Sequence, residues 1–64
     1  MTARADHDHQ EALAAAHAAC AINMARAAID LADNGRVGPA VRLILGAQMH
    51  AAKATERAWP FLDE

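Results

Sequence analysis

Apolar positions recur every three or four residues along two stretches of this chain, roughly residues 9–33 and 39–59. In a helix successive residues are about 100° apart, so this spacing gathers apolar side chains on one side. The pattern therefore predicts an all-α chain with two helices.

The segment between the two stretches carries signals for a helix end and a helix start. Asn34-Gly35 predicts a C-terminus, because glycine adopts the left-handed conformation at little cost. Pro39 suits the first turn of the next helix, where its missing N–H has no helical partner. We expect a turn over residues 34–38 and a second helix over 39–59.

The start of the first helix is predicted from a capping box. Asp8 and Glu11 have the required spacing, which places the helix start near His9. Residues 1–8 are then a flexible lead-in and 60–64 a tail, all in a single helical-hairpin domain. The short turn predicts antiparallel helices.

Three apolar stripes cover the predicted first helix. One follows coiled-coil spacing and is predicted to face the second helix: Leu13, His17, Cys20, Met24, Ala27 and Leu31. The second contains only alanines: Ala14, Ala18, Ala21, Ala25, Ala28 and Ala32. Ile22 and Ile29 lie beyond it. An arc this wide indicates more than one neighbouring helix.

The predicted second helix has one apolar face with two polar residues in it. The face consists of Val41, Leu43, Ile44, Leu45, Ala47, Ala51, Ala52, Ala54, Ala58 and Trp59, with Gln48 and Thr55 beside them. The outer side is predicted to carry Arg42, Gly46, His50, Lys53, Glu56 and Arg57. The expected pairs across the hairpin are Leu31 with Val41, Met24 with Gln48, His17 with Thr55, and Leu13 with Trp59.

The composition indicates that this hairpin needs a partner. Nineteen of the 64 residues are alanine, which favours helices but contributes little apolar area when buried. A chain of this size buries only about 60% of its unfolded surface. Cys20 is the one cysteine, so no internal disulfide forms. We expect a homodimer that completes a four-helix bundle.

Charge and targeting signals narrow the partners and the compartment. Six basic and eight acidic residues give a net charge of −2, without a dense basic run, which disfavours nucleic acid. The N-terminal residues lack the pattern of a signal peptide, and Arg26 and Asp30 interrupt the longest apolar stretch. The expectation is a cytoplasmic protein with no membrane partner.

One group of side chains suggests metal binding. His17, Cys20 and Met24 would project from one helix face within two turns, and they offer donors that Cu(I) or Zn(II) accepts. His7 and His9 could assist from the lead-in. The alternative interpretation is that the three side chains only pack, since free Cys and Met are ordinary core residues.

Catalysis and cofactor binding find no support in the sequence. Cys20 beside His17 is the one pair of nucleophile and base, with no third group to orient it and no Gly-rich loop for an oxyanion. We therefore expect a non-catalytic chain without a cofactor.

The remaining features favour a protein–protein interaction module: an adaptor, a regulatory subunit or an inhibitor. Polar side chains in a helical interface fix register and partner state. Aromatic residues in the tail either dock into a partner or cap the bundle near Leu13. The predicted interaction residues are Leu13, Ile22, Met24, Ile29, Leu31, Gln48, Thr55, Trp59, Phe61 and Leu62. The alternatives are the metal-binding protein and a nucleic-acid-associated dimer that uses Arg42, Lys53 and Arg57.

Overall fold

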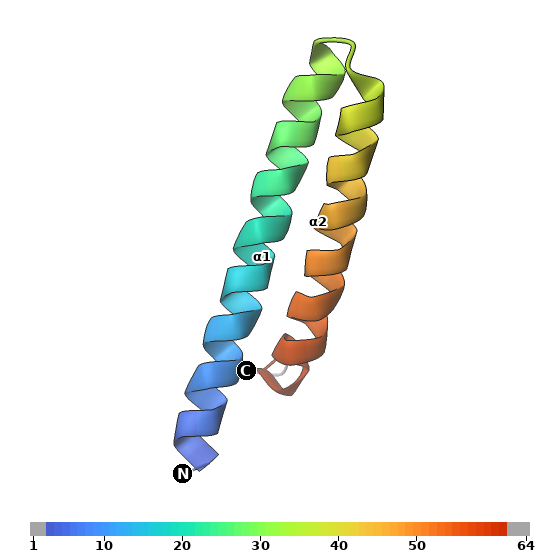
Figure 1. Cartoon of the computed structure of the whole chain (residues 1–64). Helices are drawn as coiled ribbons and strands as arrows, with labels where there is room; N and C mark the ends of the chain where they lie inside the picture. Colours follow the sequence, from blue (N-terminus) through green and yellow to red (C-terminus); the bar gives the residue numbers. More distant parts are fainter. Residues whose placement is uncertain (1–2, 62–64) are drawn as a thin grey trace.

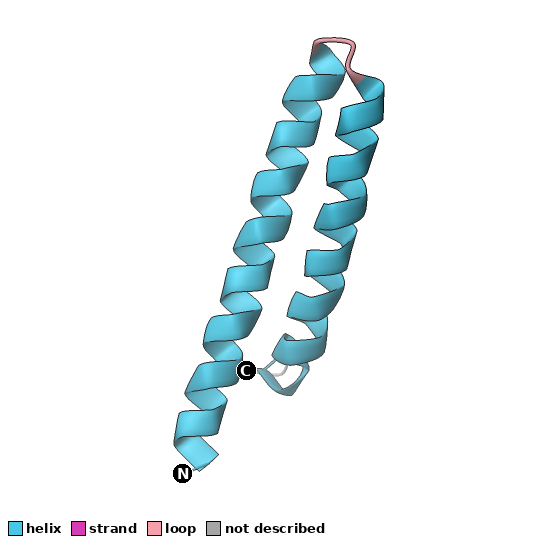
Figure 2. Ribbon diagram, viewed as in Figure 1, coloured by secondary structure: helices cyan, strands magenta, loops and turns pink. Residues whose placement is uncertain are grey.

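The chain folds into an antiparallel helical hairpin. The computed structural model describes residues 3–61, and the side chains of residues 6–60. Helix α1 (Ala3–Asp33) packs along helix α2 (Val37–Ala58), and a short 3₁₀ helix, η1 (Trp59–Phe61), follows (Figure 1). The described residues contain no strand (Figure 2). The predicted all-α hairpin is confirmed.

The turn ends α1 with a Schellman motif centred on Gly35. The Gly35 N–H donates to the Ala32 carbonyl at 3.0 Å, and the Arg36 N–H donates to the Leu31 carbonyl at 2.8 Å. Gly35 has a φ of 76°, in the left-handed region that this motif requires. The end of α1 at Asp33 therefore agrees with the prediction from Asn34-Gly35.

Both helices begin earlier than the sequence predicts. Helix α1 begins at Ala3, so Asp8 lies inside the helix and cannot cap it. Helix α2 begins at Val37, which places Pro39 at its third position. The first four N–H groups of any helix lack an intrahelical acceptor, so a proline is tolerated there as well as at the first position.

The face of α1 that packs on α2 keeps four of the six predicted residues and differs at the other two. Its buried and half-buried residues are Leu13, Ala14, His17, Ala21, Met24, Ala25, Ala28 and Leu31. Cys20 and Ala27, which were predicted to face α2, are exposed. Ala21 and Ala28 take their places.

The face of α2 that packs on α1 also differs from the prediction. Its buried and half-buried residues are Pro39, Ala40, Leu43, Gly46, Ala47, His50, Ala54, Arg57 and Ala58. The prediction was wrong to place Gly46, His50 and Arg57 on the outer side. The small residues let the helices approach closely, and the Met24 side chain lies against Gly46.

The register of the two helices follows from these contacts. Met24 meets Gly46 rather than Gln48, and His17 meets His50 rather than Thr55. The Thr55 hydroxyl instead donates to the Ala51 carbonyl of its own helix, at 3.0 Å. The early start of α2 shifts its residues relative to α1, which explains the error.

Candidate interaction surface

The interface between the helices buries only small side chains. Among the described residues the buried ones are Ala14, Ala28, Ala40 and Ala47, and no large side chain is fully buried. The large apolar residues on the surface are Ile22, Ile29, Val37, Val41, Ile44, Leu45, Met49 and Trp59. Most of the bulky apolar area thus faces outward in the single hairpin.

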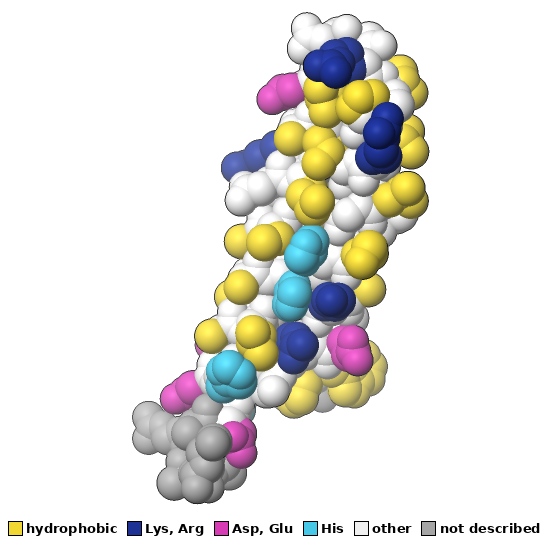
Figure 3. All heavy atoms as spheres, in the orientation of Figure 1, with side chains coloured by type: hydrophobic (Ala, Val, Ile, Leu, Met, Phe, Trp, Pro, Cys, Tyr) yellow, Lys and Arg dark blue, Asp and Glu magenta, His cyan; other side chains and the backbone are white. Residues whose placement is uncertain are grey.

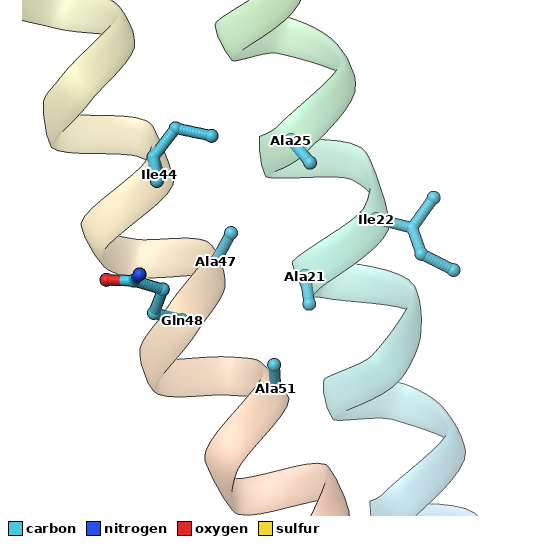
Figure 4. A pocket seen from close by; sticks show the side chains of 7 residues that line it. All are labelled: Ala21, Ile22, Ala25, Ile44, Ala47, Gln48 and Ala51. Carbon is cyan, nitrogen blue, oxygen red and sulfur yellow. The ribbon is translucent and has the colours of Figure 1, made fainter.

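Five of these bulky residues line one groove that runs between α1 and α2. Its first hollow, of about 330 Å³, is lined by Ala21, Ile22, Ala25, Ile44, Ala47, Gln48 and Ala51 (Figure 4). The second is lined by Ala28, Ile29, Ala32, Val37, Ala40, Val41 and Ile44. The hollows share Ile44, so we treat them as one surface and call it the open groove.

Figure 4 shows how the side chains of the first hollow are arranged. Ala47 and Ala51 point from α2 toward α1 at the base of the hollow. Ile22 points away from α2 on the far side of α1, and Gln48 lies on the side of α2 away from α1. The groove therefore has a floor of alanines between two raised margins.

The sequence produces the groove through a second heptad-like stripe on each helix. Several exposed groove residues come directly after an interface residue: Ile22 after Ala21, Ile29 after Ala28, and Gln48 after Ala47. A step of one residue rotates the side chain by about 100° around the helix. The two helices are antiparallel, so this rotation turns both second stripes to the same side of the hairpin.

Bulk is distributed unevenly along the open groove. Near the turn its members are branched: Ile29, Val37, Val41 and Ile44. Toward the chain ends its first hollow is lined by Ala21, Ala47 and Ala51 with Gln48, and Ile22 lies on the margin. The second hollow, near the turn, is also lined by Ala28, Ala32 and Ala40, so both hollows contain alanines and the branched residues are concentrated near the turn.

The opposite face carries histidine, lysine and arginine side chains (Figure 3). Here the Nδ1 atoms of His17 and His50 are 2.9 Å apart, a hydrogen bond in which one ring donates and the other accepts. The ring centres are 5.2 Å apart, and the ring planes are tilted by 31°. Such a pair holds at most one proton between its two Nδ1 atoms.

Positive charges surround this histidine pair. Arg57 Nη1 donates to the Gln10 side-chain oxygen at 3.3 Å, and Arg57 Nε is buried without an acceptor among the described residues. Desolvation, followed by the charges of His50, Arg57 and Lys53, lowers the pKa of His17 below its ordinary 6.5. This environment favours the neutral form of His17.

The three predicted metal-binding residues differ in their burial. His17 and Met24 face α2, whereas Cys20 is exposed. In the part of the chain that the structure describes, no three His, Cys, Asp or Glu side chains are grouped closely enough to hold a metal ion. The accessory His7 lies 3.9 Å from Glu11 on the same helix, and His9 is exposed.

The predicted interaction residues fall on different surfaces. Leu13, Met24 and Leu31 are half-buried between the helices. Ile22, Ile29 and Gln48 line the open groove, and Thr55 is exposed farther along α2. Trp59 is 72% exposed, so it does not cap the open end of the single hairpin. The side chain of Phe61, and Leu62, lie outside what the structure describes.

Sequence reasoning missed the groove residues Val37, Val41 and Ile44 as interaction sites, and it missed His50 as the partner of His17. The signal for the groove was the alternating spacing that links Val37, Val41, Ile44, Gln48, Ala51 and Thr55. His50 had no such signal, because alanines around it leave the direction of the face undecided.

Comparison with protein-family models, curated proteins and solved structures gives no match to this chain. Among the described helices, the part of α1 from Asp6 to Asp33 is long and apolar enough to span a membrane, judged by length and composition. Core helices of soluble proteins and signal sequences pass the same test. The cytoplasmic location stays a prediction.

Proposed function

We propose that this chain is a non-catalytic helical interaction module that assembles as a homodimer through the open groove. The dimer is a four-helix bundle, and it acts on a further protein as an adaptor, regulatory subunit or inhibitor. One observation carries the proposal: the hairpin buries alanines and exposes its isoleucines and valines along a single groove.

The size of the buried side chains favours a second copy as the occupant of the groove. Full burial of a Val or Ile side chain stabilises a fold by about 1.5–3 kcal/mol, and alanine has far less apolar area to contribute. Among the described residues the buried ones are four alanines, so the single hairpin lacks most of this stabilisation. Packing groove against groove removes bulky residues of both chains from water at once, as a two-fold interface does.

The surface that remains outside the bundle suggests where a further protein binds. The face with the histidine pair and the basic side chains lies away from the open groove, so it stays accessible in the dimer (Figure 3).

A charge placed in the groove tests the homodimer. Ile44→Glu should shift the sedimentation mass from dimer to monomer at micromolar concentration, because the carboxylate would be buried without a partner. Leu45→Glu is the matched control, since Leu45 is the next residue, is also exposed and does not line the groove. Equal masses for Ile44→Glu and the unaltered chain would contradict the proposal.

The same samples distinguish a protein partner from a membrane. If the apolar surface serves a bilayer, the unaltered chain will co-sediment with neutral phosphatidylcholine vesicles, and Ile44→Glu will weaken that binding. The proposed module should stay in the supernatant as a dimer. Vesicle binding that replaces the dimer would overturn the proposal.

A further inference from the structure

We propose that the two copies pack with their turns at opposite ends of the bundle, so that Gln48 of one chain faces Gln48 of the other. This arrangement rests on the proposed homodimer and adds its geometry. The open groove allows two face-to-face arrangements with two-fold symmetry: the turns lie at opposite ends or at the same end. Two features of the groove favour opposite ends.

The first feature is the position of Gln48. It is the one side chain with an amide among those that line the described hollows, and it stands at the middle of α2 (Val37–Ala58). With the turns at opposite ends, α2 packs on the α2 of the partner in antiparallel fashion. A two-fold axis near the middle of the helix then brings the two Gln48 amides together, and each can donate to the other.

The arrangement with both turns at one end leaves Gln48 without such a partner. In that case α1 of each chain packs on α2 of the other. Gln48 and Ile22 line the same hollow, so the amide would face the aliphatic region around Ile22 of the second chain. A buried amide without a hydrogen bond is unfavourable, because its contacts with water are lost and not replaced.

The second feature is the uneven bulk of the groove. A two-fold axis at Gln48 places Thr55 opposite Val41 and Trp59 opposite Val37 of the partner. On α1 an axis at Ile22 places Ile29 opposite Ala15. Ile29 near one turn thus lies over the small Ala15 of the other chain, Val41 lies over the polar Thr55, and Val37 lies over Trp59. Turns at the same end would instead stack bulky residues on bulky ones and leave the hollows empty, which close packing disfavours.

This arrangement also explains the exposure of Trp59. Its side chain is 72% exposed in the single hairpin, although a large aromatic ring has much apolar surface to bury. Val37 is 61% exposed at the other end of α2. In the antiparallel pair each residue covers the other, at both ends of the bundle.

A distance between the two turns tests the arrangement. A spin label on Asn34→Cys, in a Cys20→Ser chain, reports the separation by electron–electron dipolar spectroscopy. The 22 residues of α2 span about 33 Å, so the proposal predicts a distance of about 30–40 Å. Turns at the same end predict less than about 20 Å, because neighbouring helix axes are about 10 Å apart.

The sedimentation mass of the labelled sample tests the homodimer separately from the arrangement of its two chains. A dimer with the long distance supports the arrangement. A dimer with the short distance overturns the arrangement and leaves the homodimer standing. A monomer overturns the homodimer, and the arrangement with it.

A charge exchange at Gln48 provides an independent test. Gln48→Glu and Gln48→Lys chains should each lose the dimer, since like charges would face each other at the axis. An equimolar mixture should recover the dimer mass, because opposite charges then meet. Thr55→Glu mixed with Thr55→Lys is the control, as Thr55 faces Val41 and no recovery is expected. No recovery in the Gln48 mixture would overturn the proposed contact.

Discussion

The two apolar surfaces of this hairpin differ in the size of the side chains that form them. Between α1 and α2 the buried residues are alanines, of which Ala28 is only 3% exposed. Along the open groove the large exposed residues are branched, and Ile29 is 60% exposed. Single domains ordinarily place their largest apolar residues inside. This reversed order is the observation on which the proposed homodimer rests.

The small and the branched side chains contribute to the structure in different ways. Alanines and Gly46 set a close distance between α1 and α2, which needs small residues rather than apolar area. The branched residues provide apolar area, which stabilises the protein only when a second surface covers it. Substitutions that change the size of the side chains between α1 and α2, or the conformation of the turn, test this difference between the two surfaces.

Enlarging a buried alanine should have the largest effect. Ala28→Leu should lower the free energy of unfolding by about 1–3 kcal/mol, because the added carbons push the helices apart. Ala27→Leu is the matched control, on an exposed neighbouring position, and should change it by less than about 0.5 kcal/mol. Urea unfolding followed by circular dichroism measures both. Equal effects would mean that the helices are not closely packed.

The turn provides the next test, because it fixes how the two surfaces are aligned. Gly35→Ala should cost about 1–2 kcal/mol, since an L side chain is disfavoured at a φ of 76°. Gly38→Ala should be neutral or stabilising, because a Cβ there would meet only the Arg42 side chain, at 3.7 Å. Thermal unfolding of both variants checks this order. A Gly35→Ala chain as stable as the original would contradict the Schellman turn.

The contact of Met24 with Gly46 provides a further test of close packing between α1 and α2. A Cβ on Gly46 would lie 2.5 Å from Met24 Cε, so Gly46→Ala must displace that side chain. In a Met24→Ala chain the same change should gain the full helix propensity of alanine, roughly 1 kcal/mol. A double-mutant cycle measures the coupling between the two positions. Strictly additive effects would place Met24 away from Gly46.

Acidification should produce the smallest effect. The pKa of His17 is lowered in the folded chain, so the unfolded chain binds the proton more readily. The contribution of His17 to stability should be fully present above pH 6.5. Stability should then fall as the pH drops below 6.5, and stop falling once the pH is below the lowered pKa of the folded chain. Thermal unfolding between pH 8 and 5 measures the slope. His17→Gln should reduce it, whereas His9→Gln, at an exposed position, should leave it in place.

Much of the hairpin could be predicted from its sequence, because local chemistry determines it. Alanine favours helices, and Gly35 adopts a conformation that other residues avoid. The helix starts were harder to predict. Asp8 has the composition of a cap, but the residues before it also form helix, and a cap signal does not prevent earlier nucleation.

The packed faces could not be predicted from periodicity, and the reason is physical. On α1 the predicted face contains Cys20 and Ala27, whereas the observed face contains Ala21 and Ala28. The residues exchanged in each case are similar in size, so the apolar pattern does not distinguish the two faces. On α2 the predicted face contains Val41 and Leu45 because they are bulky and apolar. In the structure the packed face contains Ala40 and Gly46 instead. A hydrophobic pattern reports which residues avoid water in the final assembly, and it does not say which helix covers them.

The oligomeric state across a dilution series tests the central claim most directly. Light scattering behind a sizing column gives the mass, and circular dichroism gives the helicity of the same samples. The account predicts a dimer at high concentration and loss of helicity as the dimer dissociates, since a hairpin with an alanine core has little stability alone. A monomer that keeps its full helicity at every concentration would contradict it.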